Sequence, residues 1–516
     1  MKTESRCLRM IKKKIVRVLT VAGLLACLAS GCASGGSSVG KEAAADEIKK
    51  GGFTVAASCH DPQIIREGDI YYMFGSHMVG AKCQDLRKWN YFANGVDAAN
   101  TLFDNLLTEP YAAFDFVGKN TDNGYSVWAS NVIYNETMKK YVMYFCTTSS
   151  YVKSTLCFAT ADNIEGPYTY VDTILYSGYG KSNISETNLY DVLGKNADIS
   201  RYLEYGGYNN KEWPNCIDPA IFTDADGRMW MNYGSWSGGI FLLEIDPTTG
   251  YPIYPVDDKD ADPYYGYRLI GGGHHSAEGP YIQYDAENGY YYLFVSYGDL
   301  QSDGGYQIRQ FRSEKPTGPY VDVAGNTLED QDDHFNYGLK MMGNYTFPSL
   351  NYTYMAPGGQ STFQDDDGKY YITYHQRFDD GTEYHEPRVH QMYTNEDGWF
   401  VAAPFATMGE TLSEKGYKKS DVSGTFYVVN HGTDISSKIR EAEAYTFADG
   451  KVTGGEKNGT YEVKEGTDYI TITLDGVVYK GVLMEMTDEA ENPVFCFSAA
   501  GDNEETLWGV QYIKKE

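Results

Sequence analysis

The stretch from residue 218 to residue 234 reads Asp218-Pro-Ala-Ile-Phe-Thr-Asp-Ala-Asp-Gly-Arg-Met-Trp-Met-Asn-Tyr-Gly. An apolar run leads into an Asp-Gly turn, and an alternating aromatic strand returns from it, which is the pattern of a β-hairpin. Further copies of this pattern begin at residues 61, 128, 278 and 359. Because a third apolar strand follows several of these hairpins, the repeat is typical of β-propeller blades. A β-sandwich with chance repetition is the alternative, but five copies in chain order argue against it.

The rest of the chain divides into segments of different composition. Basic residues and an apolar run precede Leu28-Ala-Ser-Gly-Cys32, so residues 1–32 resemble a lipoprotein signal peptide with Cys32 as the lipidated residue. An ordinary cleaved signal peptide is the alternative. We expect residues 33–50 to form a flexible tether, 51–405 a five-bladed propeller, and 406–516 an all-β domain, either a barrel or a sandwich. The predicted protein is all-β and extracellular, and it meets the membrane only through a lipid anchor at the cell surface.

Composition limits the ligands that this protein can bind. The 516 residues carry a formal net charge of −28, and the pI is about 4.7. Such a chain repels the phosphate backbone of nucleic acids, so a nucleic-acid ligand is not expected, whereas a neutral glycan is compatible with this charge. Six cysteines follow the leader without a CxxC spacing, so the sequence predicts neither a zinc site nor a particular disulfide. We expect a monomer.

Acidic residues open three copies of the repeat, and they are Asp61, Asp218 and Glu278. We expect these residues to occupy equivalent positions, which converge on the axis of a propeller. Like charges gathered there raise the pKa of at least one carboxyl group. One protonated and one ionised carboxyl group are what the cleavage of a glycosidic bond requires, and an inverting reaction needs roughly 6.5–9.5 Å between them. The pattern therefore favours a glycoside hydrolase.

The segments around these acids resemble a known family. The catalytic motifs of glycoside hydrolase family 43 are similar to His60-Asp-Pro, Ile217-Asp-Pro and Ala277-Glu-Gly-Pro-Tyr. Within that family, Asn215-Cys-Ile-Asp-Pro-Ala-Ile-Phe and Tyr233-Gly-Ser-Trp-Ser-Gly-Gly-Ile resemble segments of endo-α-1,5-L-arabinanases. The resemblance covers residues 55–405 and implies a five-bladed propeller that acts with inversion. It also implies that Asp61 is the general base, that Glu278 is the general acid, and that Asp218 orients Glu278 and tunes its pKa.

The same resemblance suggests the ligands and the residues that surround the acids. The expected substrate is arabinan, a pectic polysaccharide, or its oligosaccharides. His375 is expected near a calcium ion whose shell is completed by water, with a hydrogen-bonded channel histidine as the alternative. Trp128 is expected either to stack on a sugar or to pack between blades, and His60, Asn215 and Ser235 to bind sugar hydroxyls. An exo-acting arabinofuranosidase or β-xylosidase and a non-catalytic glycan-binding lipoprotein remain the alternative functions.

Overall fold

The computed structural model describes residues 39–328 and 337–515. The predicted signal peptide, Cys32 and the first part of the predicted tether lie outside the described residues. Across the described part of the chain, no helix combines the length and the apolar character needed to cross a membrane.

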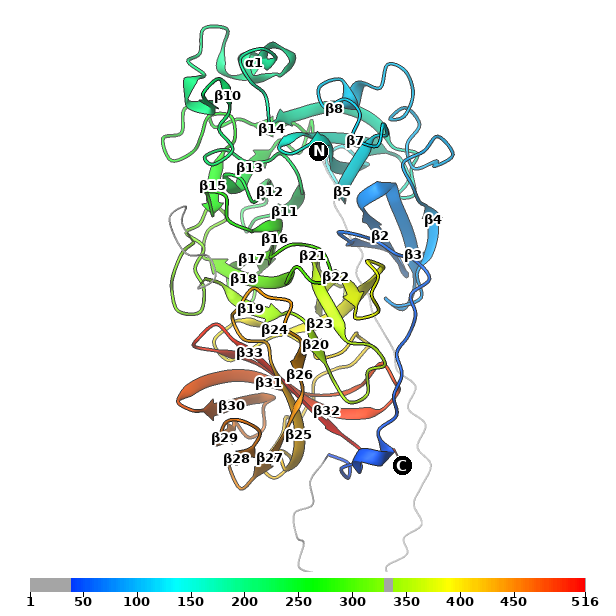
Figure 1. The fold of residues 1–516 in the computed structure, drawn as a ribbon, viewed down its shortest axis with the longest axis vertical. Coiled ribbons are helices and arrows are strands. Elements are labelled where there is room, and N and C mark those ends of the chain that lie inside the picture. The colour runs from blue at the N-terminus through cyan, green and yellow to red at the C-terminus, as the bar shows by residue number, and fades with distance from the viewer. Residues whose placement is uncertain (1–38, 329–336, 516) are drawn as a thin grey trace, which may run out of the picture. The chain divides into compact units, whose positions relative to one another are not determined.

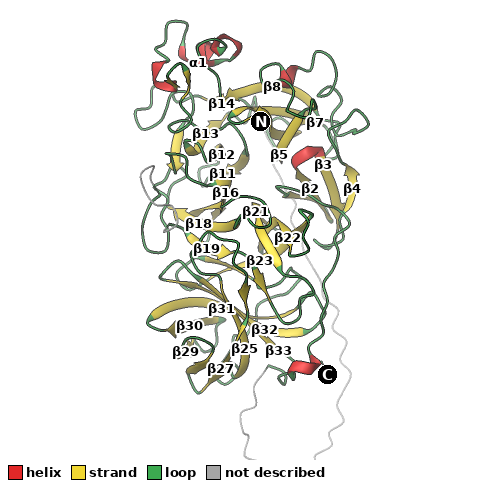
Figure 2. Cartoon of the chain, viewed as in Figure 1, coloured by secondary structure: helices red, strands yellow, loops and turns green. Residues whose placement is uncertain are grey.

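Five sheets within residues 63–328, 337–402 and 440–441 are arranged around a common axis as propeller blades (Figures 1 and 2). The predicted five-bladed propeller is therefore confirmed. In blades 1 to 4 the first strand is innermost and paired strands run antiparallel. In blade 5 the inner strand is residues 354–364, and residues 345–346 pair antiparallel with it and parallel with residues 440–441. The strands are, in blade 1, β1 (Gln63–Glu67), β2 (Ile70–Gly75), β3 (Val79–Cys83) and β4 (Asn90–Ala93); in blade 2, β5 (Ser126–Asn135), β6 (Lys140–Ser150), β7 (Lys153–Ala161) and β8 (Thr169–Tyr176); in blade 3, β11 (Ala220–Thr223), β12 (Met229–Ser235), β13 (Gly239–Ile245), β14 (Pro252–Ile253) and β15 (Tyr267–Ile270); in blade 4, β16 (Glu278–Asp285), β17 (Tyr290–Tyr297), β18 (Gln307–Ser313) and β19 (Leu339–Met342); and in blade 5, β20 (Tyr345–Thr346), β21 (Tyr354–Gln364), β22 (Tyr370–Phe378), β23 (His385–Thr394), β24 (Phe400–Ala402) and β26 (Arg440–Glu441).

The hairpin turns form where the sequence predicts them. In blade 3, the Asp224 carboxylate accepts hydrogen bonds from the backbone N–H groups of Asp226 and Arg228, at 2.9 Å each. This arrangement is an Asx turn, in which the side chain replaces a backbone acceptor. Gly227 follows with a φ of 81°, a left-handed conformation that glycine adopts without a steric penalty. Asp-Gly turns of this kind therefore set the register of the hairpin.

The C-terminal region forms a closed β-barrel within residues 424–512, which decides between the two expected architectures. Its interior is a cluster of buried aromatic and aliphatic side chains, including Phe426, Phe447 and Phe497. In ring order, its strands are β25 (Gly424–Asn430), β27 (Glu443–Ala448), β28 (Lys451–Gly454), β29 (Gly459–Val463), β30 (Tyr469–Leu474), β31 (Val477–Thr487), β32 (Pro493–Gly501) and β33 (Thr506–Tyr512).

The segment from residue 39 to residue 50 differs from the expected flexible tether. Glu42 forms a β-bridge with Ile513 at the end of the barrel. The Asn492 side chain donates to the Lys49 carbonyl oxygen at 2.9 Å and accepts from the Lys49 N–H at 3.0 Å. These bonds attach the segment to the barrel, so the tether prediction is wrong for the described residues 39–50.

The remaining elements lie mainly in long connections between blades. Residues 94–125 and 177–219 each lead from the outer edge of one blade to the inner strand of the next. They therefore emerge on the face where the inner strands begin, which we call the entry face. The second-to-third strand turns, including residues 151–152, 236–238 and 298–306, lie on the same face because successive strands alternate in direction. The short elements are η1 (Ala45–Glu47), η2 (Ser76–Met78), η3 (Ala112–Phe114), η4 (Ile184–Glu186), α1 (Leu189–Leu193), η5 (Ser200–Tyr202), β9 (Leu203–Glu204) and β10 (Gly207–Tyr208).

Candidate active site

Each blade reaches the axis through a residue in the left-handed conformation. These residues are Asp61, Ala129, Asp218, Gly279 and Gly359, with φ values of 54°, 47°, 55°, 56° and 57°. Left-handed backbone is unfavourable for residues with a side chain, so Asp61, Ala129 and Asp218 carry local strain. The recurrence of one backbone conformation identifies the structurally equivalent positions in all five blades.

This equivalence corrects the expected register of Glu278. Gly279, and not Glu278, occupies the position that Asp61 and Asp218 hold in their blades. The pairing of Glu278 with Ser296, followed by a bulge, matches the pairing of Trp128 with Cys146. Glu278 therefore stands one residue before the position of the two aspartates. A bulge inserts an extra residue and re-aims the neighbouring side chains, which is how a residue out of register still reaches the axis.

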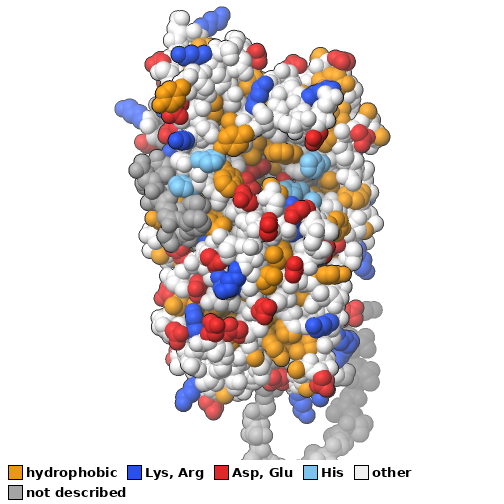
Figure 3. All heavy atoms as spheres, in the orientation of Figure 1, with side chains coloured by type: hydrophobic (Ala, Val, Ile, Leu, Met, Phe, Trp, Pro, Cys, Tyr) orange, Lys and Arg blue, Asp and Glu red, His pale blue; other side chains and the backbone are white. Residues whose placement is uncertain are grey.

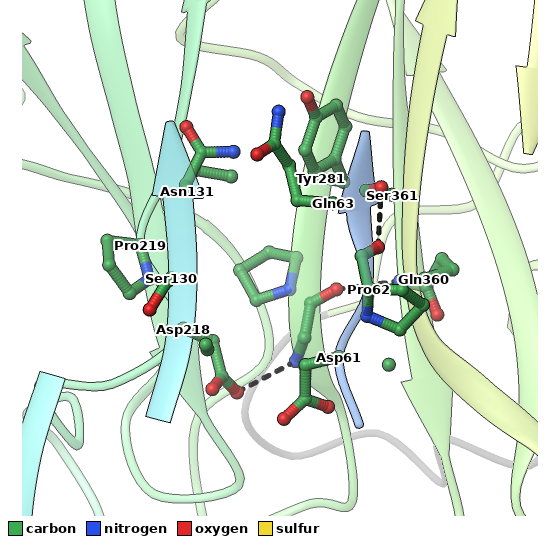
Figure 4. Close-up of a pocket in the computed structure, with 15 residues that line it drawn as sticks. Asp61, Pro62, Gln63, Ser130, Asn131, Asp218, Pro219, Tyr281, Gln360 and Ser361 are labelled. Carbon is green, nitrogen blue, oxygen red and sulfur yellow. Dashed lines mark hydrogen bonds between the residues drawn. The ribbon is translucent and has the colours of Figure 1, made fainter. Parts of the chain in front are cut away.

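The residues that follow these positions surround a small cavity on the axis. Three successive residues from each blade line it, beginning at Asp61, Ala129, Asp218, Gly279 and Gly359, and its volume is about 40 Å³. The side chains of Asp61 and Asp218 lie at one end of the cavity, whereas those of Asn131, Gln63 and Tyr281 lie at the other (Figure 4). The carboxylates are thus at the end from which the inner strands begin.

Asp61 is held in its ionised form by several donors. Its Oδ2 atom lies 2.7 Å from His60 Nδ1 and accepts a hydrogen bond of 2.6 Å from Ser76 Oγ. Ser76 Oγ in turn accepts from the N–H of Ala129 at 2.9 Å, which fixes the hydroxyl between blades 1 and 2. Burial acts to raise the pKa of Asp61, but His60 and Ser76 outweigh it and the pKa is lowered. Such a carboxylate is suited to accept a proton.

The surroundings of Glu278 shift its pKa in the opposite direction. Burial raises the pKa of Glu278, and the negative charge of Asp61 raises it further. The hydrogen bond from Tyr306 lowers the pKa, but the net shift is upward. Tyr306 donates its hydroxyl to Oε1 at 2.8 Å, and Ser235 donates to Oε2 at 3.2 Å. A half-buried carboxyl group with a raised pKa is suited to donate a proton.

Asp218 connects the two groups electrostatically. Burial raises its pKa, and the negative charges of Asp61 and Glu278 raise it further. Its Oδ2 atom accepts a hydrogen bond of 3.1 Å from the N–H of Gly279, the residue after Glu278 (Figure 4). Asp218 therefore fixes the backbone that carries Glu278. The structure brings all three predicted carboxylates into one electrostatically coupled group.

Histidines form a stack beside Asp61. The rings of His60 and His375 are 3.9 Å apart between centroids and nearly parallel, and His385 packs edge-on against His60 at 5.2 Å. Burial lowers the pKa of His375 well below its usual value, so the ring is neutral and its nitrogens can bind a metal. Its Nε2 atom is buried without a hydrogen-bond partner, and His60, Asp61 and His375 each offer a ligand atom, all within 4.8 Å of one another.

The other predicted residues have different surroundings. Trp128 is half-buried and packs against the hydrophobic core that includes blades 1 to 3, so it has the contacts of a packing residue. Asn215 is half-buried and accepts a bond of 3.4 Å from Ser177 Oγ. Ser235 binds Glu278, and His60 binds Asp61, so both contact a carboxylate of the site.

The sequence predictions missed Ser76, Tyr306 and His385. The first of these has a signal in the repeat, because a Gly-Ser pair stands at the end of the second strand in two blades, as Gly75-Ser76 and as Gly234-Ser235, although Ser76 itself begins η2. Tyr306 ends residues 298–306, the connection between β17 and β18. The repeat does not predict a role for Tyr306, because this connection differs in length from those at the same place in the other blades. His385 begins β23 in blade 5, and its place beside His60 of blade 1 depends on the closure of the ring.

Comparisons with known proteins agree with this site. The profile of glycosyl hydrolases family 43 matches residues 184–400, and that of a C-terminal lipocalin-like domain matches residues 404–509. The chain is 38% identical over 467 residues to the extracellular endo-α-(1→5)-L-arabinanase 2 of Bacillus subtilis, covering 88% of this chain and 92% of that relative. It is 36% identical over 472 residues to the extracellular endo-α-(1→5)-L-arabinanase of Thermotoga petrophila, covering 88% and 94%.

The crystal structure of endo-1,5-α-L-arabinanase from Thermotoga petrophila has the same architecture, with a TM-score of 0.77 at 35% identity, covering 90% of this chain and 100% of that chain. A propeller with coupled carboxyl groups at its entry face defines the protein as a glycoside hydrolase. By sequence and structure, the chain belongs to glycoside hydrolase family 43.

Proposed function

We propose that this enzyme hydrolyses internal α-1,5-L-arabinofuranosidic bonds of arabinan with inversion of the anomeric centre. The observation that carries the proposal is the gathering of Asp61, Asp218 and Glu278 at the entry face. There His60 and Ser76 bind Asp61 and lower its pKa, whereas burial raises the pKa of Glu278. The substrate is supported by the relatives from Bacillus subtilis and Thermotoga petrophila, both of which are named endo-arabinanases.

The proposed reaction divides the work between the two carboxyl groups. Asp61 accepts a proton from a water molecule, whose oxygen then bonds to the anomeric carbon of the sugar. Glu278 gives its proton to O5 of the departing sugar as the bond between that oxygen and the anomeric carbon breaks. Asp218 does not touch the reacting atoms in this scheme; through the N–H of Gly279 it holds the backbone that carries Glu278.

A calcium ion at His375 is a further part of the proposal. The unpartnered Nε2 atom fits a metal bond, but calcium prefers oxygen ligands, so water must supply most of the shell. When bound, the ion supplies positive charge near Asp61 and favours its ionised form. Metal analysis of the purified protein, together with the melting temperature before and after treatment with EDTA, tests this site. A His375→Ala protein that retains equimolar calcium contradicts it.

The decisive test of the proposed function follows product sizes over time. Soluble protein beginning at residue 34 is incubated with debranched linear arabinan, and early mixed oligosaccharides are expected. Release of arabinose alone supports the exo-acting alternative instead. A lack of products from arabinan and xylan, combined with retained glycan binding, supports the non-catalytic alternative.

We also propose that the enzyme is a secreted monomer anchored through lipidated Cys32. The leader sequence supports the anchor, and both relatives are named extracellular. Labelling of expressing cells with a radioactive fatty acid should mark the wild-type protein and not Cys32→Ala. Light scattering of the soluble form measures its oligomeric state.

A further inference from the structure

Three aromatic side chains gather on the entry face, outside the group of carboxylates. We call Tyr151, Trp236 and His274 the aromatic wall. The Tyr151 ring meets the His274 ring edge-on at 5.8 Å, and the Trp236 ring lies 5.7 Å from the His274 ring. Tyr151 is 64% exposed although it lies among these contacts. On the face drawn in Figure 3, histidine side chains lie beside exposed hydrophobic and acidic side chains in the upper half.

The wall is held in a defined arrangement. The Tyr151 hydroxyl lies 2.9 Å from His274 Nδ1 and accepts a hydrogen bond of 3.1 Å from Asn210 Nδ2. His274 has a φ of 72°, and its N–H donates to the carbonyl oxygen of Ser237 at 3.1 Å. Strained backbone of this kind persists where the surroundings fix it and is common at ligand sites. Asn210 belongs to the inserted connection 177–219, so this insertion helps to fix the position of Tyr151.

The wall lies on the side of the general acid. Trp236 directly follows Ser235, which donates to Glu278 Oε2 at 3.2 Å. His274 lies four residues before Glu278 in the chain, with Ala277 N–H donating to the His275 carbonyl oxygen between them. The general acid protonates the departing sugar, so the part of the substrate nearest to Glu278 is the leaving group.

We infer that the aromatic wall binds the arabinofuranosyl units on the leaving-group side of the cleaved bond, and this inference rests on the proposed function. Exposed rings offer apolar faces to the C–H groups of a sugar, and Asn210 and His274 offer polar atoms to its hydroxyls. A subsite here selects chains that extend beyond the cleaved bond. It therefore favours internal bonds with long leaving groups.

Arabinohexaose labelled at its reducing end tests the inference, because the label remains on the leaving group. Tyr151→Ala is the primary variant, since Tyr151 lies in an exposed turn. We expect kcat/KM to fall about 5- to 10-fold and the labelled products to become shorter, because long leaving groups lose their stacking contact. Tyr151→Phe keeps the ring and should retain most of the wild-type rate and product pattern.

Tyr134→Ala is the matched control. Tyr134 is 41% exposed and lies in blade 2, as Tyr151 does. It stands near the end of the inner strand β5, on the face opposite the entry face. Its removal should leave kcat/KM and the product pattern unchanged.

Three outcomes overturn the inference. They are an unchanged product pattern in Tyr151→Ala, labelled products that become longer, and an equal loss of rate in Tyr134→Ala. Failure of the proposed function has a different readout, because the wild-type enzyme then leaves arabinohexaose and arabinan intact.

Discussion

The propeller and the barrel both close into rings, but they do so in different ways. In the barrel, β25 pairs with β33 through a continuous backbone ladder from Tyr427↔Val510 to Asn430↔Leu507. In the propeller, no strand of the described residues passes from blade 1 to blade 5. Side chains join these blades instead, as when Ser361 donates to the carbonyl oxygen of Pro62 at 2.8 Å.

The interiors of the two rings differ accordingly. The barrel is filled by packed apolar side chains, and the ladder between β25 and β33 closes it. The propeller leaves a cavity on its axis, flanked by strained backbone and by three carboxylates that repel one another. The difference indicates that the axis of the propeller is maintained for chemistry at a cost in stability, whereas the barrel contributes stability.

The strongest test of this contrast removes the charges at the axis. Asp61→Asn and Glu278→Gln should each reduce hydrolysis about 10²- to 10⁴-fold, because each removes a general acid or base. The melting temperature should stay constant or rise in Glu278→Gln, because the raised pKa of Glu278 means that the fold disfavours its ionised form. It should fall slightly in Asp61→Asn, which loses the charge that His60 and Ser76 stabilise. Rates on linear arabinan and thermal unfolding measure both effects.

Exposed carboxylates at the opposite ends of the same blades provide controls. Asp69→Asn and Glu287→Gln alter the net charge equally without reaching the axis. Both should retain wild-type activity. A wild-type rate in Glu278→Gln contradicts the assignment of the acid.

A single methyl group provides the next test. A Cβ atom at Gly359 would lie 2.3 Å from Asp61 Oδ1 and 2.8 Å from His375 Nδ1, in a left-handed conformation that alanine disfavours. We expect Gly359→Ala to lower kcat/KM about 100-fold, because displacement of a catalytic group by an ångström costs this much. Gly368→Ala, in the turn of the same blade, has a φ of 84° and open space around it. If both variants lose activity equally, strain alone and not the contact with Asp61 is responsible.

The sequence contains enough information for the repeat but not for the register of the bulges. The hairpins of all five blades and the three carboxylates follow from local patterns, because turn chemistry and strand alternation are local. Glu278 was expected in the register of Asp61, and only the recurrent left-handed residue shows that Gly279 holds that position. Contacts such as Tyr306 with Glu278 depend on how distant segments meet, which a single sequence does not specify.

The hydroxyl of Tyr306 provides a finer test through pH. Hydrolysis should decline in acid, as Asp61 becomes protonated, and in alkali, as Glu278 loses its proton. The hydrogen bond from Tyr306 stabilises the ionised form of Glu278 and lowers its pKa against the effect of burial. Tyr306→Phe should therefore move the alkaline limb of the kcat/KM profile to higher pH. Tyr297→Phe, a buried tyrosine of the same blade, should leave the limb in place; a shift in both variants points to a general change in burial.

The closure of the propeller by side chains predicts the smallest effect, one on stability without loss of catalysis. The Asp365 side chain is 6% exposed, accepts the Tyr71 hydroxyl at 2.6 Å and pairs with Arg66, so that it joins blade 5 to blade 1. Asp365→Ala should lower the free energy of unfolding by about 1–3 kcal/mol, because it leaves the partners of a buried carboxylate unsatisfied. Asp367→Ala, in the same turn but 52% exposed, should change it by less than about 1 kcal/mol.

The pH dependence of the stability lost in Asp365→Ala shows whether Asp365 stabilises the fold through its charge or through packing. Burial acts to raise the pKa of Asp365, but the bonds from Tyr71 and Arg66 outweigh it, and the pKa is lowered in the fold. The stability that Asp365 adds is therefore complete above its unfolded pKa and is lost as the pH falls through the folded value. The gap between Asp365→Ala and wild type should shrink in acid, as denaturant titrations at several pH values can measure. A gap that stays constant indicates that Asp365 acts through its volume, and packing instead of charge would then join blade 5 to blade 1.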